Sequence, residues 1–282
     1  EQNEIEFLVS PVEQAADQLV MAKWIIRNLA YKYGIDVTFA PKITTGKAGS
    51  GLHFHTRLVK DGKSVMIKNG KLSEEAKHAI AGYMKCASSL TAFGNTNPMS
   101  YFRLVPHQEA PTSICWGDRN RSVLVRVPLG WTGKNDMVSI ANPLETKTME
   151  ASDKQTVEMR SPDGSADIYQ MLAGLTVAAR TGFELEDALG VAGKTYVDVN
   201  IHSHENENKL KSLEQLPSSC MESAKELDAK RHLYEKDGVF NKTLIDGVID
   251  HLKSYNDENT REQAEKNPQL LSELVKKYYH CG

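Results

Sequence analysis

The sequence predicts an α+β fold built around a mainly antiparallel sheet. Segments in which apolar and polar residues alternate, as in strands, are separated by helical segments, without the regular strand-helix alternation of a parallel sheet. Three of the strand-like segments, residues 2–7, 49–55 and 156–160, also carry metal-ligand side chains at alternate positions. Because alternate side chains of a strand share a face, we expect a sheet with one apolar face and one polar face that holds a site.

The first half of the chain is expected to contain two long helices. Apolar residues over 12–30 have helical spacing, and Gly34 is placed to end that helix. Ser73 is a favoured helix cap followed by two glutamates, and the second helix is expected to run from there to about Phe93. Between and before these helices we expect strands over residues 2–7, 35–39 and 53–55, and a turn at Asp61-Gly62.

The second half begins with a stretch, residues 101–131, that is rich in predicted strands. Glu158 lies in the last strand of the set, and a helix is expected from Ser165 to Ala178. The polar, lysine-rich residues 203–215 are expected to form a surface loop. From about residue 217 the chain is predicted to be helical, and its first helix begins at Ser219, with Glu222 in place for a capping box.

The composition excludes several classes of protein. Hydrophobic residues make up 40% of the 282 residues and charged residues 25%, and a net charge of -3 gives no electrostatic argument for nucleic acid. No apolar stretch approaches the roughly 20 residues that span a bilayer. The four cysteines have no metal-type spacing, so we interpret them as reduced thiols. We therefore expect a cytoplasmic protein that binds neither nucleic acid nor membranes.

Alternation predicts where the chemistry lies. It places His53 and His55 on one face of their strand and Glu158 with Arg160 on one face of theirs, and the first segment carries the carboxylates Glu4 and Glu6. Carboxylates, an imidazole and arginines together suit a divalent metal that holds phosphates. Taken singly, each feature has a plainer interpretation, because His-X-His is more often a surface or core pair, and Glu158 with Arg160 can be a surface ion pair.

Several separated motifs, taken together in their order, resemble the catalytic domain of glutamine synthetase. That resemblance implies a curved, mainly antiparallel sheet with helices packed on its outer face, as in the glutamine synthetase and guanido kinase catalytic domains. It covers residues 1–185 closely and the remainder more loosely, and ordered motifs are more specific than any single one. The motifs are Gly-Ser-Gly-Leu-His-Phe-His at 49–55, Tyr-Phe-Arg-Leu-Val-Pro at 101–106, Glu-Ala-Pro at 109–111, the segment 116–122, and Val-Glu-Met-Arg-Ser-Pro-Asp at 157–163.

The resemblance implies roles for the metal and amino-acid sites. Glu4 matches a ligand of a first metal ion, and His53 and Glu158 match ligands of a second ion on the ATP phosphates, which would be Mg²⁺ or Mn²⁺. On the amino-acid side, the backbone carbonyl of Gly49 would receive the ammonium group of glutamate, Arg103 would bind its carboxylate, and Arg160 would lie near the γ-phosphoryl group.

It also implies roles for nucleotide binding and catalysis. Arg121 and Arg126 match phosphate-binding arginines, and His55 lies where the family contacts the nucleotide. Glu109 matches a glutamate on a mobile flap that shields the intermediate and accepts a proton from ammonium. The catalytic pair is therefore expected to be Glu109 and Arg121.

The implied reaction is the ATP-dependent ligation of glutamate to ammonia. ATP would convert the poorly reactive carboxylate to γ-glutamyl phosphate, which ammonia then attacks, while metal ions and arginines neutralise the transferred phosphoryl group. A base must release free ammonia, and water must be excluded because it would hydrolyse the intermediate. The resemblance also implies that the parent protein assembles into a ring-type homo-oligomer.

Two alternatives for the function stay open. Ala48 replaces a common asparagine, and His107-Gln108 replaces a usual Gly-aromatic pair, so a polyamine or another amine is a possible acceptor. A catalytically silent homologue with a structural or binding role is the second alternative. The family also carries an N-terminal β-grasp domain and an early catalytic strand with two metal-binding glutamates, and neither is in this sequence. We therefore interpret residues 1–282 as a partial catalytic domain that is inactive in isolation.

Overall fold

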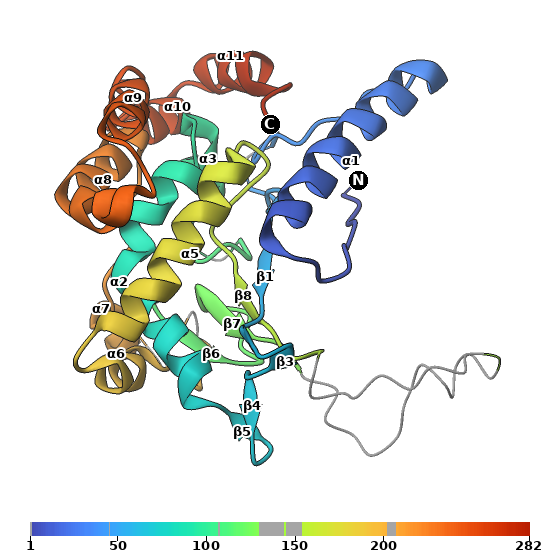
Figure 1. The fold of residues 1–282 in the computed structure, drawn as a ribbon. Coiled ribbons are helices and arrows are strands. Elements are labelled where there is room, and N and C mark those ends of the chain that lie inside the picture. Colours follow the sequence, from blue (N-terminus) through green and yellow to red (C-terminus); the bar gives the residue numbers. More distant parts are fainter. Residues whose placement is uncertain (1, 45, 107, 130–143, 145–153, 202–206) are drawn as a thin grey trace.

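A four-stranded sheet forms the centre of the computed structural model, which describes residues 2–44, 46–106, 108–129, 144, 154–201 and 207–282 (Figure 1). Two of its three strand pairings are antiparallel and one, between β6 and β7, is parallel. The predicted α+β fold with a mainly antiparallel sheet is therefore confirmed. The strands lie in the order β1 (Phe54–Thr56), β8 (Val157–Met159), β7 (Val125–Val127) and β6 (Trp116–Asp118).

Two small hairpins follow β1 along the chain. The first turns at Asp61-Gly62, as predicted, and the second turns at Asn69-Gly70. All four turn residues have a positive φ, between 51° and 74°, which is the backbone geometry of a tight two-residue hairpin turn. The hairpins consist of β2 (Val59–Lys60) with β3 (Lys63–Ser64), and β4 (Ile67–Lys68) with β5 (Lys71–Leu72).

Helices α2 (Glu74–Gly94) and α5 (Ile168–Glu184) lie side by side next to the sheet (Figure 1). Their apolar side chains and those of one sheet face form a single core, which includes Phe93 of α2, Met171 of α5 and Met159 of β8. Helices α6 (Ala188–Thr195) and α8 (Cys220–Glu235) pack against other parts of α2. Since α2 is enclosed on several sides, most of its residues are buried, in keeping with its apolar composition.

Two glycines allow α2 and α5 to approach each other closely. A Cβ atom added to Gly82 would lie 1.8 Å from the carbonyl oxygen of Ala178, and one added to Gly182 would lie 1.9 Å from that of His78. Neither distance is compatible with a side chain. The helix pair that supports the sheet therefore depends on backbone-to-backbone contact at this crossing.

The predicted helix ends are largely confirmed by their caps. The hydroxyl of Ser73 accepts a hydrogen bond from the backbone N–H of Ala76 (3.0 Å), and Gly34 ends α1 (Val12–Tyr33) with a φ of 62°. At the start of α8 the Ser219 hydroxyl accepts from the N–H of Glu222. The carboxylate of Glu222 accepts from the N–H of Ser218, one residue before the position that a standard capping box uses. Helix α5 begins three residues later than predicted, at Ile168 after the cap Asp167, and ends at Glu184 rather than at Ala178.

Three predicted strand segments are wrong. Residues 2–10 and 35–39 have no regular structure, because a strand needs a hydrogen-bonded neighbour and these segments have none among the described residues. In the second segment, Thr38 donates its hydroxyl to the carbonyl of Tyr279 instead. The third segment, at the start of 101–131, lies in helix α3 (Pro98–Arg103), whose cap Asn97 accepts from the N–H of Met99.

The C-terminal part is helical, as predicted. Its last two helices pack on α3 through a small apolar cluster around Met99, Phe102 and Tyr278. The predicted loop over 203–215 starts outside the described residues, and its described part contains a short helix. No helix in the described part of the chain is long and apolar enough to cross a membrane. These elements are α7 (Glu207–Lys211), η3 (Lys236–Gly238), α9 (Lys242–Lys253), α10 (Thr260–Lys266) and α11 (Pro268–Tyr278).

Candidate active site

The strand register places three polar side chains in one row across the sheet. His55 of β1 is paired with Glu158 of β8, and Glu158 is paired with Arg126 of β7. Directly paired residues project from the same face, so these three side chains share the face opposite to the core. The neighbouring positions Met159 and Val125 are buried in the core, at 2% and 0% exposure. The predicted division into an apolar and a polar face is therefore present at these strands.

Glu158 is surrounded by cationic groups or groups that can become cationic. Its Oε1 atom lies 2.9 Å from Nδ1 of His53 and 3.4 Å from Nε of Arg160, and its Oε2 atom lies 2.7 Å from Nε of Arg126. The two arginine contacts are ion pairs that lack normal hydrogen-bond geometry. Glu158 is only 2% exposed, so a single buried carboxylate holds together side chains from three separate parts of the chain.

This environment favours the charged form of Glu158. Burial alone would raise the pKa of the carboxyl, but the hydrogen bond from His53 and the charges of His53, Arg126 and Arg160 outweigh it, so the pKa lies below its ordinary value. Partial desolvation of the His55 ring lowers its pKa, against the opposing effect of Glu158. Its Nδ1 atom lies 3.0 Å from Oγ1 of Thr156, which orients the ring. At neutral pH the row therefore contains an anionic Glu158 beside a neutral His55.

Arg160 connects the row to two loops. Its Nη1 atom donates to the backbone carbonyls of Arg121 and Val123, and its Nη2 atom donates to the carbonyl of Glu109 (3.2 Å). Arg160 is 6% exposed, and burial lowers the pKa of its guanidinium. Glu109 itself is exposed and has a φ of 64°, a left-handed conformation that is uncommon for a glutamate. The loop that carries Glu109 is thus attached to the ion-pair cluster by its backbone while its side chain faces solvent.

Arg103 lies under the glycine-rich segment 49–51. It is 3% exposed, and its Nη1 and Nη2 atoms donate to the carbonyls of Ser161 (2.6 Å) and Arg160 (3.0 Å). Burial lowers its pKa to about 10. A Cβ atom at Gly51 would lie 2.5 Å from Nη2 of Arg103, so only glycine permits this approach. The guanidinium that was expected to bind a carboxylate is bonded to protein carbonyls here.

Glu4 is not part of this cluster. It lies in the largely exposed segment 2–10, in which the strand expected over residues 2–7 is absent. That segment contacts the glycine-rich loop at Gln2, whose Nε2 atom donates to the carbonyl of Gly49 (2.9 Å). Without a strand neighbour, nothing directs the Glu4 side chain toward Glu158, although the charge of the nearby Glu6 acts on the pKa of His55. Gly49 and His53 precede β1 rather than lying in a strand, and His53 contacts Glu158.

The donor chemistry fits a metal ion only in part. His53 and Glu158 supply an imidazole and a carboxylate, which are ligand types that Mn²⁺ and Mg²⁺ sites use. Within the described ranges, however, no group of three or more histidine, cysteine, aspartate or glutamate side chains is arranged to hold a metal ion. Two ligands fall short of the six that Mg²⁺ prefers, and the rest would have to come from a bound phosphate, water and carboxylates such as Glu4.

The sequence patterns missed two features beside the site. Lys42 is 2% exposed, and its ammonium group donates to the side chain of Gln108 and to the carbonyl of Lys47. This contact joins the glycine-rich loop to the loop of Glu109. Asp163 is fully buried and accepts a hydrogen bond from the side-chain amide of Asn95 (2.8 Å). The only sequence clue to either was its position, because Asp163 ends the motif at 157–163 and Lys42 precedes the glycine-rich motif.

The comparison with known sequences gives one family. A family model described as "Glutamine synthetase, catalytic domain" matches residues 1–269. The glutamine synthetase of Pyrococcus furiosus is 35% identical over 255 residues, which are 90% of this chain and 53% of that protein. The glutamine synthetase of Escherichia coli K12 is 31% identical over 250 residues, 88% of this chain and 48% of that protein. The chain spans about half the length of these curated relatives.

Solved structures share the fold. A cryo-EM structure of Plasmodium falciparum glutamine synthetase gives a TM-score of 0.68 over 89% of this chain and 52% of that chain. A structure described as "Apo GmaS without ligand" gives 0.69 over 92% and 54%. Both are 22% identical, so they show the fold alone. Together with the sequence matches over nearly the whole chain, they establish that this chain belongs to the glutamine synthetase catalytic-domain family.

Proposed function

We propose that the full-length protein is an ATP-dependent ligase that joins the γ-carboxylate of glutamate to ammonia through a γ-glutamyl phosphate intermediate. The observation that carries the proposal is the cluster of His53, Arg126 and Arg160 around Glu158, on the sheet face that is not used by the core. Such a cluster can bind a phosphate group, because a phosphate brings negative charge to the arginines and the carboxylate keeps them in place.

The phosphate-binding roles fall on residues around this row. Arg126 and Arg121 would hold the phosphates of ATP, His55 would contact the nucleotide, and Arg160 would lie at the γ-phosphoryl group. Positioned cations are needed because negative charge spreads over the phosphoryl oxygens during transfer. The carbonyl contacts of Arg160 support this assignment, since they fix its guanidinium between β8 and two loops.

Mg²⁺ or Mn²⁺ is proposed to be held by His53 and Glu158, with Glu4 as a ligand of a further ion. Bound there, a divalent ion would neutralise phosphate charge. Glu4 would join only if the segment 2–10 changes its conformation, because it lies apart from the other two residues here.

The amino-acid side of the site is proposed to use three residues. The Gly49 carbonyl would accept from the ammonium group of glutamate, and Arg103 would attract its carboxylate from below the glycine-rich loop. Glu109 would take a proton from ammonium and cover the intermediate. Its strained backbone and its contact with Arg160 support a loop whose position depends on the phosphate site. In this proposal the full-length protein assembles as a ring-type homo-oligomer.

The decisive experiment measures ADP release by the full-length protein with ATP, Mg²⁺ and glutamate, in the presence of either ammonium or a polyamine. We expect ammonium-dependent ADP release with glutamine as the product, identified by mass spectrometry. Arg126→Gln should lower kcat at least about 100-fold. The matched control is Arg180→Gln, which removes an arginine that pairs with Glu184 and Asp237 on the helical side.

The same assay separates the alternatives. ADP release with the polyamine and not with ammonium would show that the acceptor is a polyamine, while the protein would still be an ATP-dependent ligase. No ADP release with any amine from a folded, full-length protein would identify a silent homologue. Such a homologue would have no need for the charge cluster around Glu158, which is the observation that favours an enzyme.

A further inference from the structure

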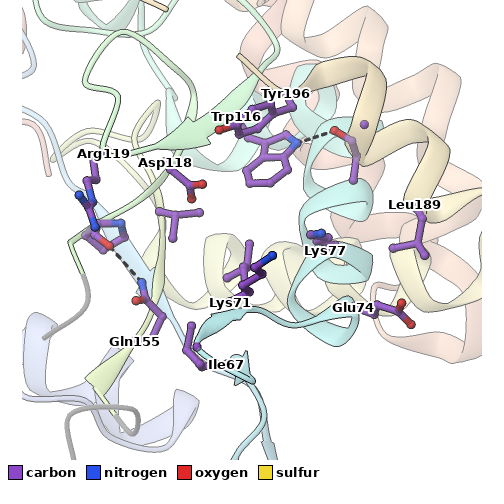
Figure 2. Close-up of a pocket in the computed structure, with 16 residues that line it drawn as sticks. Ile67, Lys71, Glu74, Lys77, Trp116, Asp118, Arg119, Gln155, Leu189 and Tyr196 are labelled. Carbon is purple, nitrogen blue, oxygen red and sulfur yellow. Dashed lines mark hydrogen bonds between the residues drawn. The ribbon is translucent and has the colours of Figure 1, made fainter. Parts of the chain in front are cut away.

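A cavity lies on the opposite side of the sheet from Glu158. It has a volume of about 740 Å³, is partly open to solvent and is lined by the β4–β5 hairpin, the first turn of α2, strands β6 and β7, and helix α6 (Figure 2). Val127 of β7 and Trp116 of β6 line it, whereas Arg126, the residue before Val127, projects from the other face of β7. Because successive strand residues point to opposite faces, this cavity and the proposed phosphate site share a strand but no side chain.

One wall of the cavity is rigid and aromatic. Trp116 is 5% exposed, its Nε1 atom donates to the carbonyl of Ala192 in α6 (2.7 Å), and its ring lies 4.8 Å from that of Tyr196. These contacts fix the indole against the cavity. Ile67, Leu72 and Leu189 extend the apolar lining.

The opposite wall carries positive charge. Lys71, Lys77 and Arg119 line the cavity, and none of the three forms an ion pair with any residue in the described part of the chain. Figure 2 shows the side chains of Lys71 and Lys77 directed toward the interior, whereas the carboxylate of Glu74 points away from them. The other acid, Asp118, lies beside the hydroxyl of Tyr196, and its charge raises the pKa of that hydroxyl after the larger effect of burial.

We propose that this cavity binds a small organic anion with two or more carboxylate or phosphate groups. The volume is within the roughly 300–1,000 Å³ of ordinary ligand pockets, and such pockets combine an apolar wall with a few placed charges. Two lysines that form no ion pair with an acid among the described residues supply the charge, and Trp116 supplies a flat surface for the carbon skeleton. The site is separate from the one proposed for ATP and glutamate, and it does not depend on that function.

Gly193 provides a way to block the cavity without changing its charge. It lies in α6 on the cavity wall, and a Cβ atom built on it meets no other atom within 4 Å. Gly193→Leu should therefore fill the space while keeping the helix. Lys71→Met with Lys77→Met removes the charge instead. The matched control is Lys85→Met, an exposed lysine farther along α2 that does not line the cavity.

The test measures binding by the fluorescence of Trp116 in this chain, with Trp24 and Trp131 replaced by phenylalanine. Citrate serves as the carboxylate probe and inorganic pyrophosphate as the phosphate probe, each at constant ionic strength maintained with NaCl. We expect a saturable change with a Kd in the millimolar range or tighter for at least one probe, and the two arms show which anion is preferred. The lysine pair and Gly193→Leu should each weaken binding at least tenfold, whereas Lys85→Met and Arg126→Gln should not.

Two results would overturn the proposal. One is the absence of a saturable response to either probe. The other is a response that is unchanged in both the lysine and Gly193→Leu variants, because binding would then take place elsewhere. Circular dichroism of each variant verifies that it is folded, and the two cavity variants act by different means, so the misfolding of one leaves the other as a test.

Discussion

Glu158 balances the charges of the site, because two arginines and a histidine converge on it while almost no water reaches it. Glu158→Gln would leave Arg126 and Arg160 without a carboxylate. Breaking a fully buried ion pair costs about 3–5 kcal/mol, and the partial exposure of Arg126 and His53 reduces the expected loss in the free energy of unfolding to about 2 kcal/mol. Urea denaturation at pH 7 measures it, with the exposed, ion-paired Glu184→Gln as a control that should show no comparable loss.

The effect of Glu158→Gln on the free energy of unfolding should depend on pH. The pKa of Glu158 is lowered in the folded chain, so its charge contributes stability above the unfolded-state pKa of about 4.3, and that contribution is lost as the pH falls through the lower, folded-state value. The difference between wild type and Glu158→Gln should therefore be constant from pH 7 to about 5 and shrink below about pH 4. A difference that grows in acid would show that the carboxyl is protonated in the native state.

Glu109 and Arg121 should respond differently to a change of nucleophile in the full-length protein. Removing a positioned base costs about 10²- to 10⁴-fold in rate, so Glu109→Ala should cripple amide formation while ATP binding is largely retained. Arg121→Ala should impair phosphoryl transfer itself. Hydroxylamine is largely neutral near pH 7 and needs no deprotonation, so it should partly rescue Glu109→Ala but not Arg121→Ala. An equal loss with ammonia and hydroxylamine in Glu109→Ala would reduce Glu109 to a structural role.

At the scale of elements, the crossing of α2 and α5 is the contact that is most sensitive to volume. Gly82→Ala places a methyl group 1.8 Å from a backbone carbonyl, which forces the helices apart and should lower the free energy of unfolding by about 1–3 kcal/mol or more. Gly193→Ala in α6 is the control, because the added methyl group meets nothing and alanine favours a helix by about 0.5–1 kcal/mol. Thermal or urea unfolding of the two variants should therefore give shifts of opposite sign.

The short strands of the central sheet are hard to predict from sequence, yet their register sets the positions of the site residues. Each strand of the central sheet has only three residues, so alternation by itself is a weak pattern. The pairing of His55, Glu158 and Arg126 nevertheless fixes which face each occupies, and a shift by one residue would turn Glu158 into the core. The segments 2–7 and 35–39 have similar alternation but pair with no strand in the described part of the chain, which the local sequence does not reveal.

At the scale of the whole molecule, the chain spans about half the length of its relatives. We predict that the isolated 282 residues have no ligase activity, whereas the longer parent protein does. The described residues supply two metal-ligand side chains in contact, and Glu4 lies apart from them. The measurement is glutamate-dependent ADP production by the purified chain with Mg²⁺ and ammonium, with the full-length protein as positive control. Activity in the isolated chain, free of contaminating enzyme, would contradict the prediction.

The sequence by itself determined the long helices, their caps and the motifs. Ser73, Gly34 and Ser219 act through bonds to residues close in the chain, so their effect can be inferred locally. The motif order determined the family, and the pairing of His53 with Glu158 was expected from it. The sequence did not predict the position of Glu4, because that position depends on strand pairing. It also did not predict the helix at Tyr101, because that helix depends on the cap at Asn97.

Only the tertiary structure decided which partners the charged side chains contact. Side chains from positions 53, 126 and 160 meet at Glu158. The sequence could not show that Arg103 bonds to carbonyls, that Arg160 holds the Glu109 loop, or that Lys42 contacts Gln108. The cavity beside Trp116 is likewise built from stretches that are distant in sequence, residues 67–77, 116–128 and 189–196, together with Gln155. The physical reason is the same in each case: local patterns fix which face a side chain occupies, whereas burial and charge depend on which other segments pack against that face.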